Sequence, residues 1–150
     1  MRAAALALAL CGIGGAAFAA PAWCPDLKRV TDVAATGALA HIAGPPREGS
    51  FRGTTMSLAG WRDCSLYGAR TYTCDSGALK TAADAERALA ALVVEVTDCL
   101  GEGWSRDVSR SSPMYVVMRS EHDPVSITLS TDQADDGDHV VRLTLFMRGR

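Results

Sequence analysis

The sequence contains no asparagine, and its only lysines are Lys28 and Lys80, so arginine supplies almost all of the positive charge. The formal net charge is -2 at pH 7. Domains that bind nucleic acid usually carry a strongly basic surface, and this charge balance predicts no nucleic-acid partner. With 48% hydrophobic and 21% charged residues over 150 positions, the composition is typical of one globular domain.

Motifs for catalysis and metal binding are also missing. The sequence has no C-x-x-C pair, no H-E-x-x-H and no G-x-S-x-G elbow. The three histidines, His41, His122 and His139, do not stand beside cysteines at a ligand spacing. We therefore expect no metal, no cofactor and no catalytic residue. A small hydrolase whose side chains meet only in three dimensions stays open as an alternative.

The first residues have the features of a bacterial export signal. One positive charge at Arg2 precedes an apolar run from Ala3 to Phe18, and the small residues Ala17 and Ala19 form the cleavage site, with the cut after Ala19. We expect residues 1–19 to be a signal peptide and residues 20–150 to form a single exported domain. The protein is then periplasmic or secreted.

A membrane anchor and a lipid anchor are the alternatives for this segment. The apolar run is shorter than the roughly 20 residues that a spanning helix needs, and no later run is longer, so we expect no transmembrane segment after cleavage. Lipidation at Cys11 is disfavoured because Leu10 occupies the position that takes a small residue in a lipoprotein signal.

Four cysteines remain after cleavage: Cys24, Cys64, Cys74 and Cys99. An even number in an oxidising compartment predicts two disulfides, and three connectivities are compatible with the sequence. Residues 64–74 have the pattern of two short strands around a glycine-containing turn. With Cys64 opposite Cys74 and residues 68–70 as the loop, the two Cβ atoms are about 4.5–5.5 Å apart. This geometry favours Cys64–Cys74 and leaves Cys24–Cys99.

The hydrophobic pattern predicts two helices and several strands. Apolar residues at helical spacing predict one helix over 25–43 and a second over 81–100. At the start of the second, Thr81 and Asp84 resemble a capping box. Strand patterns cover 50–58, 114–119, 125–131 and 139–147, besides the hairpin at 64–74. We predict an α+β fold in which an antiparallel sheet has the two helices packed on one face. The expected order is helix, strands, helix, three strands.

Two segments carry residue types that are common at binding hot spots. The predicted loop 101–112 contains Trp104, Arg106 and Arg110, and the tip of the predicted hairpin contains Tyr67 and Arg70. A rigid hairpin tip loses little entropy when it enters a partner's cleft. The alternative is that Trp104 covers the end of the core and the other side chains are solvated.

The acidic turn Asp132–Asp138 is the densest group of carboxylates in the chain. An EF-hand alignment that uses Gly137 as the invariant glycine places Ala134 at the third position and Leu143 at the twelfth, where ligands are required. We therefore interpret the segment as a solvated hairpin connection.

These features together predict a small exported binding protein without catalytic activity. We expect it to act on a protein partner in the bacterial envelope, as an inhibitor or an immunity-type protein does. An accessory subunit of an envelope or secretion assembly is the alternative in the same compartment.

Overall fold

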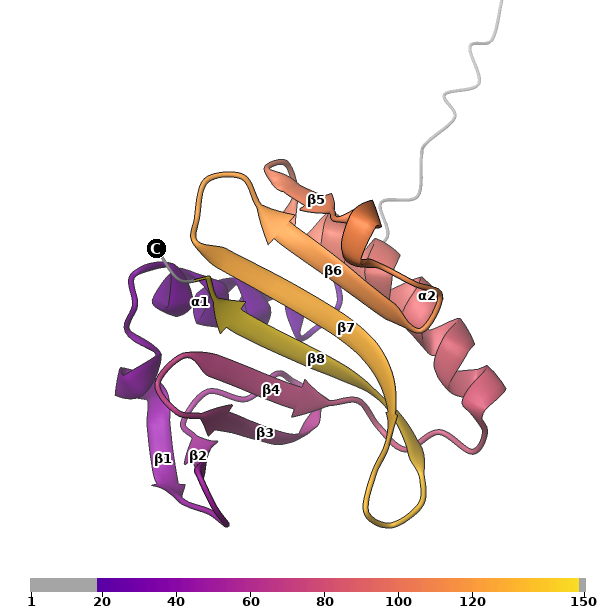
Figure 1. Ribbon diagram of the computed structural model, residues 1–150, viewed down its shortest axis with the longest axis horizontal. Helices are drawn as coiled ribbons and strands as arrows, with labels where there is room; N and C mark the ends of the chain where they lie inside the picture. The colour runs from indigo at the N-terminus through magenta and orange to yellow at the C-terminus, as the bar shows by residue number, and fades with distance from the viewer. Residues whose placement is uncertain (1–18, 149–150) are drawn as a thin grey trace, which may run out of the picture.

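The computed structural model describes residues 19–148, which form two α-helices and one antiparallel sheet of eight strands (Figure 1). The predicted signal peptide lies outside the described residues except for Ala19. The helices are α1 (Cys24–Ala35) and α2 (Ala82–Leu100). The strands are β1 (Ala43–Pro46), β2 (Phe51–Thr54), β3 (Arg62–Tyr67), β4 (Thr71–Asp75), β5 (Trp104–Arg106), β6 (Tyr115–Ser120), β7 (Val125–Gln133) and β8 (His139–Met147). Their order across the sheet is β1-β2-β3-β4-β8-β7-β6-β5.

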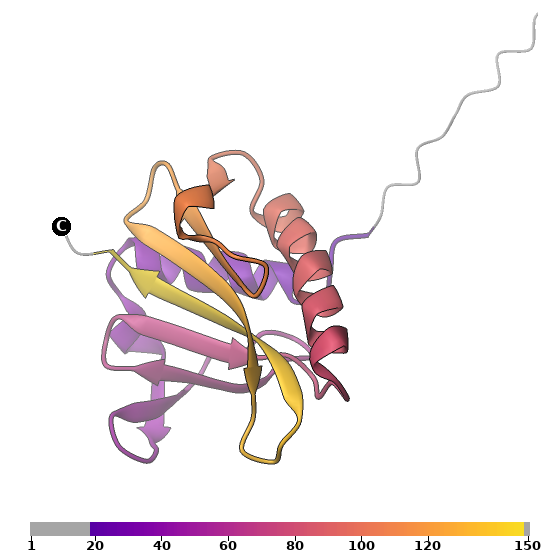
Figure 2. The same ribbon diagram turned by 45° about the vertical axis from the view of Figure 1, so that its right-hand side comes forward.

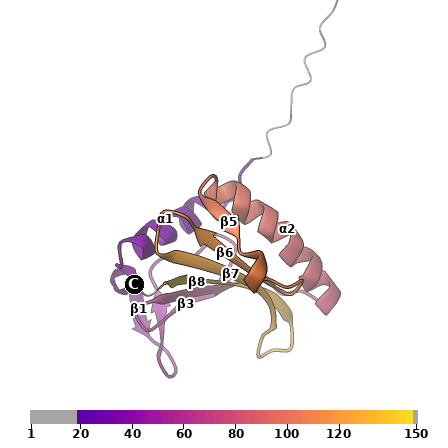
Figure 3. The same ribbon diagram turned by 45° about the horizontal axis from the view of Figure 1, so that its top comes forward.

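The core lies between the helices and the central strands. Both helices contact β7 and β8 and also each other, and the two turned views show them on the same side of the curved sheet (Figures 2 and 3). The fully buried residues of this layer alternate along the strands with residues of the opposite face. They include Leu66, Tyr72, Met118, Ile127, Leu129, Leu143 and Leu145 from the sheet and Leu27, Val30, Leu89 and Val96 from the helices.

The first helix is shorter than predicted. It ends at Ala35 because Gly37 adopts φ +77°. The amides of Gly37 and Ala38 bond back to the carbonyls of Ala34 and Val33 in a Schellman arrangement. A 3₁₀ turn, η1 (Leu39–Ile42), and strand β1 follow. The predicted extension of this helix to Ala43 was therefore wrong, because Gly37 ends the helix.

Two other predicted boundaries were also wrong. The strand expected at 50–58 ends at Thr54, where the hydroxyl group of Thr54 accepts a hydrogen bond from the amide of Met56 and draws the chain out of the sheet. The predicted loop 101–112 contains strand β5 and a 3₁₀ turn, η2 (Val108–Arg110), because β5 pairs with β6.

The predicted disulfides and the start of the second helix are confirmed. Cys24 is bonded to Cys99, and Cys64 is bonded to Cys74. The predicted hairpin register also holds next to that bond, where Ser65 faces Thr73 and Tyr67 faces Thr71. At α2, the amide of Asp84 donates to the Thr81 side chain at 3.1 Å. None of the helices within residues 19–148 is long and apolar enough to cross a membrane.

Candidate functional site

The face of the sheet that points away from α1 and α2, here called the open face, carries side chains in three rows across the strands. In each row, residues that face each other on neighbouring strands lie side by side across the sheet. The charged row is Arg62, Asp75, Arg142, Ser130 and Tyr115; the hydroxyl row is Ser65, Thr73, Thr144 and Thr128; the aromatic row is Phe51, Tyr67, Thr71 and Phe146. The rows follow from the period of two along each strand.

A cleft of about 770 Å³ occupies part of this face. Its floor is formed by β3, β4 and β8, while Arg47 and Phe51 contribute from the β1–β2 hairpin and residues 133–136 from the β7–β8 turn. In Figure 1 these two hairpins extend from the lower edge of the sheet on either side of β3 and β4. We call this hollow the open-face cleft. It joins parts of all three rows.

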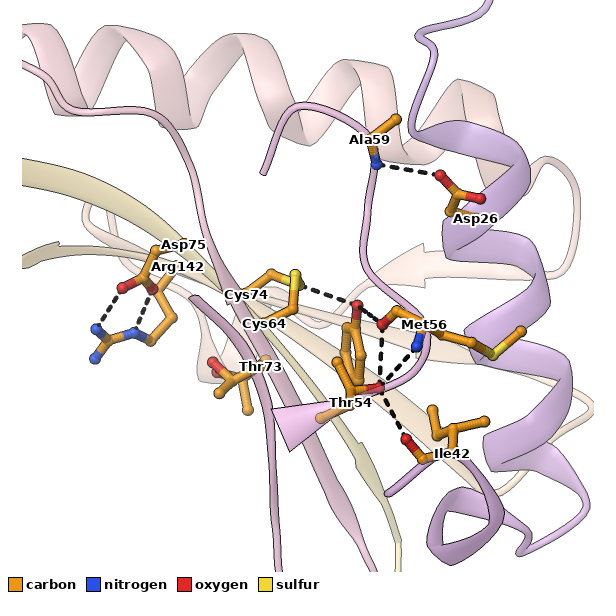
Figure 4. The surroundings of a disulfide bond; sticks show 12 residues. Asp26, Ile42, Thr54, Met56, Ala59, Cys64, Thr73, Cys74, Asp75 and Arg142 are labelled. Atoms are coloured by element: carbon orange, nitrogen blue, oxygen red, sulfur yellow. Dashed lines mark hydrogen bonds and ion pairs between the residues drawn. A yellow bond between two sulfur atoms is a disulfide. The ribbon is translucent and has the colours of Figure 1, made fainter. Parts of the chain in front are cut away.

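Arg142 is held in the charged row by two carboxylates. Its Nε and Nη2 donate to the Oδ1 and Oδ2 atoms of Asp75 at 2.7 and 2.9 Å, and its Nη1 pairs with Asp132. These hydrogen bonds, first of all those to Asp75, raise the pKa of the Arg142 guanidinium above its ordinary value. Figure 4 shows the pair and Thr73 on one side of β4, with the Cys64–Cys74 disulfide on the other. Two carboxylates therefore compensate the charge of Arg142 within the protein.

Arg62, the other arginine on the cleft floor, has no such partners. Its Nη1 lies 3.7 Å from Oδ2 of Asp136, which is an ion pair but too long for a hydrogen bond. Its Nε and Nη2 are buried and donate to no acceptor in the described part of the chain. A buried charged donor without an acceptor is costly. Arg62 is thus the arginine on the cleft floor with unused hydrogen-bonding capacity.

A β-bulge next to Arg62 sets the direction of its side chain. The β3–β4 register shifts by one residue between Arg62 and Ser65. Asp63, inside the bulge, is the one residue other than glycine with positive φ in the described chain, at +53°. Bulges re-aim side chains and are frequent beside functional sites. The bulge places Arg62 opposite Asp75 at the cleft.

The backbone at Asp63 leads to a prediction on stability. We expect Asp63→Gly to change the free energy of unfolding by less than about 0.5 kcal/mol, because glycine adopts positive φ without strain. Asp63→Val is expected to cost about 1–2 kcal/mol, because a β-branched residue is strained there. Urea unfolding of both variants measures the difference. Equal stability of the glycine and valine variants would contradict the assignment of strain to this position.

An aromatic pair marks the other end of the cleft. The rings of Phe51 and Tyr67 lie 5.2 Å apart between centroids and are tilted at 53°. Both side chains remain well exposed, at 44% and 52% of their full surface. Exposed aromatic rings that are fixed by a neighbour bury much apolar area on binding at small entropic cost.

The sequence-predicted candidates do not come together. Tyr67 lines the open-face cleft, and Arg70 is exposed in the adjoining turn. Trp104, Arg106 and Arg110 lie in or beside β5, at the far end of the sheet from β2 and β3. Trp104 is packed against the core there, and Arg106 is exposed. Loop 101–112 and the hairpin tip are therefore separate surfaces.

Asp107 organises the segment around Arg110. It accepts a hydrogen bond from Ser109 at 2.6 Å and forms ion pairs with Arg119 at 2.9 Å and Arg110 at 3.9 Å. The bond from Ser109, with the two arginines, lowers the pKa of the Asp107 carboxyl. Ordered in this way, the segment leaves Arg110 turned toward a carboxylate of its own chain.

The lowered pKa predicts a pH dependence. Stability from a carboxyl whose folded pKa is depressed is fully present above the unfolded value and disappears as the pH falls through the folded value. We expect Asp107→Asn to be less stable than the wild type at pH 7 and the difference to vanish once the pH falls below the lowered pKa of the Asp107 carboxyl. Thermal unfolding at several pH values measures it. A difference that is constant with pH would show that the ionised carboxylate does not contribute.

Several residues of the cleft were missed by sequence reasoning. Arg62 begins β3, Asp75 ends β4 and Arg142 lies inside β8. Each is charged where the other outward positions of its strand are uncharged, and this was the available signal. The acidic turn was interpreted as a solvated connection, whereas Asp132 and Asp136 contact the two arginines of the charged row. Within residues 19–148, no three His, Cys, Asp or Glu side chains gather as metal ligands.

Comparison with known proteins gives no relative from which a role could be transferred. The chain matches no protein-family model, no curated protein and no solved structure.

Proposed function

We propose that the protein is exported and binds a protein partner through the open face, without catalysing a reaction. It acts in the bacterial envelope as an inhibitor or immunity-type protein. The observation that carries this proposal is the composition of the cleft and its rim, where Phe51, Tyr67, Arg62 and Arg142 surround a floor of serine and threonine. Aromatic residues and arginine are enriched in the centres of protein interfaces, and hydroxyl groups supply adaptable hydrogen bonds around them.

The rigidity of the floor supports the same proposal. The Cys64–Cys74 disulfide joins β3 and β4 directly behind the cleft, and the Asp75–Arg142 pair joins β4 to β8. A surface that is already ordered loses little conformational entropy when a partner binds. Export is supported by the first 19 residues and by the pairing of all four remaining cysteines, since disulfides persist in oxidising compartments.

Capture of a partner tests this function. Tagged residues 20–150 are incubated with the envelope and periplasmic fraction of the host under non-reducing conditions, beside a Phe51→Ala/Tyr67→Ala variant. We expect one protein to be retained in stoichiometric amount by the wild type and to be lost with the double variant. An Arg106→Ala variant, altered at the far edge of the sheet, should retain it. Equal retention by all three forms, or no retained protein, would contradict binding through the open face.

A further inference from the structure

The charges of the cleft are not compensated equally, and this indicates what the partner contributes. Arg142 has two carboxylates, Asp75 and Asp132. Arg62 has one carboxylate at 3.7 Å, and both donors on its Nε–Nη2 edge are without acceptors among the described residues. Because a guanidinium edge offers two parallel N–H groups, it fits the two oxygens of a planar carboxylate. This edge of Arg62 is therefore suited to an oxyanion with two acceptor atoms.

The position of Arg62 allows it to meet such a group. Its side chain is 32% exposed and lines the cleft, and binding of a ligand at the buried Nε–Nη2 edge requires a rotation about its terminal torsions toward the cleft. The rotation gives up only the 3.7 Å contact with Asp136. It also relieves the cost of two unsatisfied donors.

The aromatic pair adds a second requirement for the occupant. Across the β3–β4 pair, Arg62 faces Asp75 and Tyr67 faces Thr71. Because Asp75 and Thr71 are four residues apart, Arg62 and Tyr67 are separated by roughly 13 Å along the strand. A protein segment with an acidic side chain and a nearby apolar side chain spans such a distance. An inorganic anion reaches only the arginine end.

On the basis of the proposed function, we propose that the open-face cleft receives an acidic side chain of the partner protein, bound side-on by Nε and Nη2 of Arg62. A neighbouring apolar side chain of the same partner segment packs on Phe51 and Tyr67. The partner's carboxylate replaces Asp136 as the counter-charge of Arg62, and the β7–β8 turn, which carries Asp136, forms the wall of the site.

A pair of small probes tests this inference without the partner. The peptide acetyl-Glu-Ala-Ala-Ala-Tyr-amide carries a carboxylate and an aromatic ring four residues apart, which matches the roughly 13 Å separation when the peptide is extended. The peptide with glutamine in place of glutamate, the amide probe, has the same ring without the charge. Each is titrated into the ¹⁵N-labelled mature chain while the arginine Nε–H resonances are recorded by NMR. We expect the carboxylate probe to shift one resonance that is absent from the spectrum of Arg62→Gln, and the amide probe to leave it in place. Inorganic phosphate should shift it less at equal concentration, because it makes no contact with the aromatic pair.

Three variants test whether the carboxylate probe binds at Arg62. Arg62→Gln should weaken binding of the carboxylate probe by about tenfold or more, the loss expected for a charge-assisted pair of hydrogen bonds. Asp136→Asn removes the competing carboxylate but keeps the acceptor for the Asp138 amide, and it should strengthen binding a few-fold. Arg106→Gln is the control with an equal change of charge, on β5, and should bind as the wild type does.

Equal shifts by acid and amide, no shift in the wild type, or unchanged affinity in Arg62→Gln would each overturn the inference. These outcomes differ from failure of the proposed function. If the carboxylate probe fails but a partner is still captured through Phe51 and Tyr67, only the role of Arg62 is wrong. If no partner is captured, the function is wrong and the titration still decides whether Arg62 binds carboxylates.

Discussion

Removal of the Cys24–Cys99 disulfide is expected to lower the free energy of unfolding by about 4.5 kcal/mol, the chain-entropy estimate for a loop of this length. The two cysteines are 75 positions apart. Their bond joins the first residue of α1 to the last turn of α2, so it fixes both helices over the sheet. Domains of this size have a typical total stability of about 5–15 kcal/mol. Urea unfolding of Cys24→Ala/Cys99→Ala at 25 °C measures the loss.

The second disulfide provides a matched control. Cys64 and Cys74 are only 10 positions apart, and the same model assigns that loop about 3 kcal/mol or less. Cys64→Ala/Cys74→Ala removes the same atoms from buried positions, so the contributions from lost packing are similar. A larger loss from the short loop than from the long one would contradict this order.

Filling the open-face cleft should abolish binding of the partner. Thr73 stands on the cleft floor in the hydroxyl row, with its Oγ1 atom 3.3 Å from that of Thr144. An arginine at this position occupies the space between the two hairpins, while its guanidinium group still reaches water through the opening. We expect Thr73→Arg to weaken affinity at least about 100-fold, because a hot-spot pocket tolerates no obstruction at its centre. Isothermal titration with the captured partner measures the change.

The control for this variant places the same side chain on the other face. Ala91 is exposed on α2 and lines a smaller groove of about 400 Å³ beside Trp23 and Trp61. Ala91→Arg introduces the same side chain and the same added charge, and should bind as the wild type does. The reverse result, with Ala91→Arg inactive and Thr73→Arg normal, would move the interface to the helix side of the molecule.

Local sequence features predicted those parts of the fold that depend on neighbouring residues. Alternation in 125–131 and 139–147 predicted the central strands β7 and β8, and the capping residues Thr81 and Asp84 predicted the start of α2. The disulfide between Cys64 and Cys74 followed from hairpin register alone. Each of these is decided within about 20 residues of chain, where side-chain period and turn chemistry act directly.

The cleft was harder to predict because it is assembled from distant segments. Asp75 meets Arg142 only because β4 pairs with β8, and these residues are 67 positions apart. Nothing in either strand specifies the other as its neighbour. The bulge at Asp63 is a second reason, because a shift of one residue in register turns side chains to the other face. Tyr67 was predicted as a candidate because it is an aromatic residue at the tip of a disulfide-bonded hairpin, and its role in binding stays a prediction.

A map of the bound surface tests the central claim most directly. The amide resonances of the ¹⁵N-labelled mature chain are recorded with and without one equivalent of the captured partner. The open-face interface predicts that the largest changes fall on β3, β4 and β8 around Ser65, Thr73 and Thr144, and on the β7–β8 turn. Changes concentrated on α2 and residues 59–61, with those strands unaffected, would contradict it.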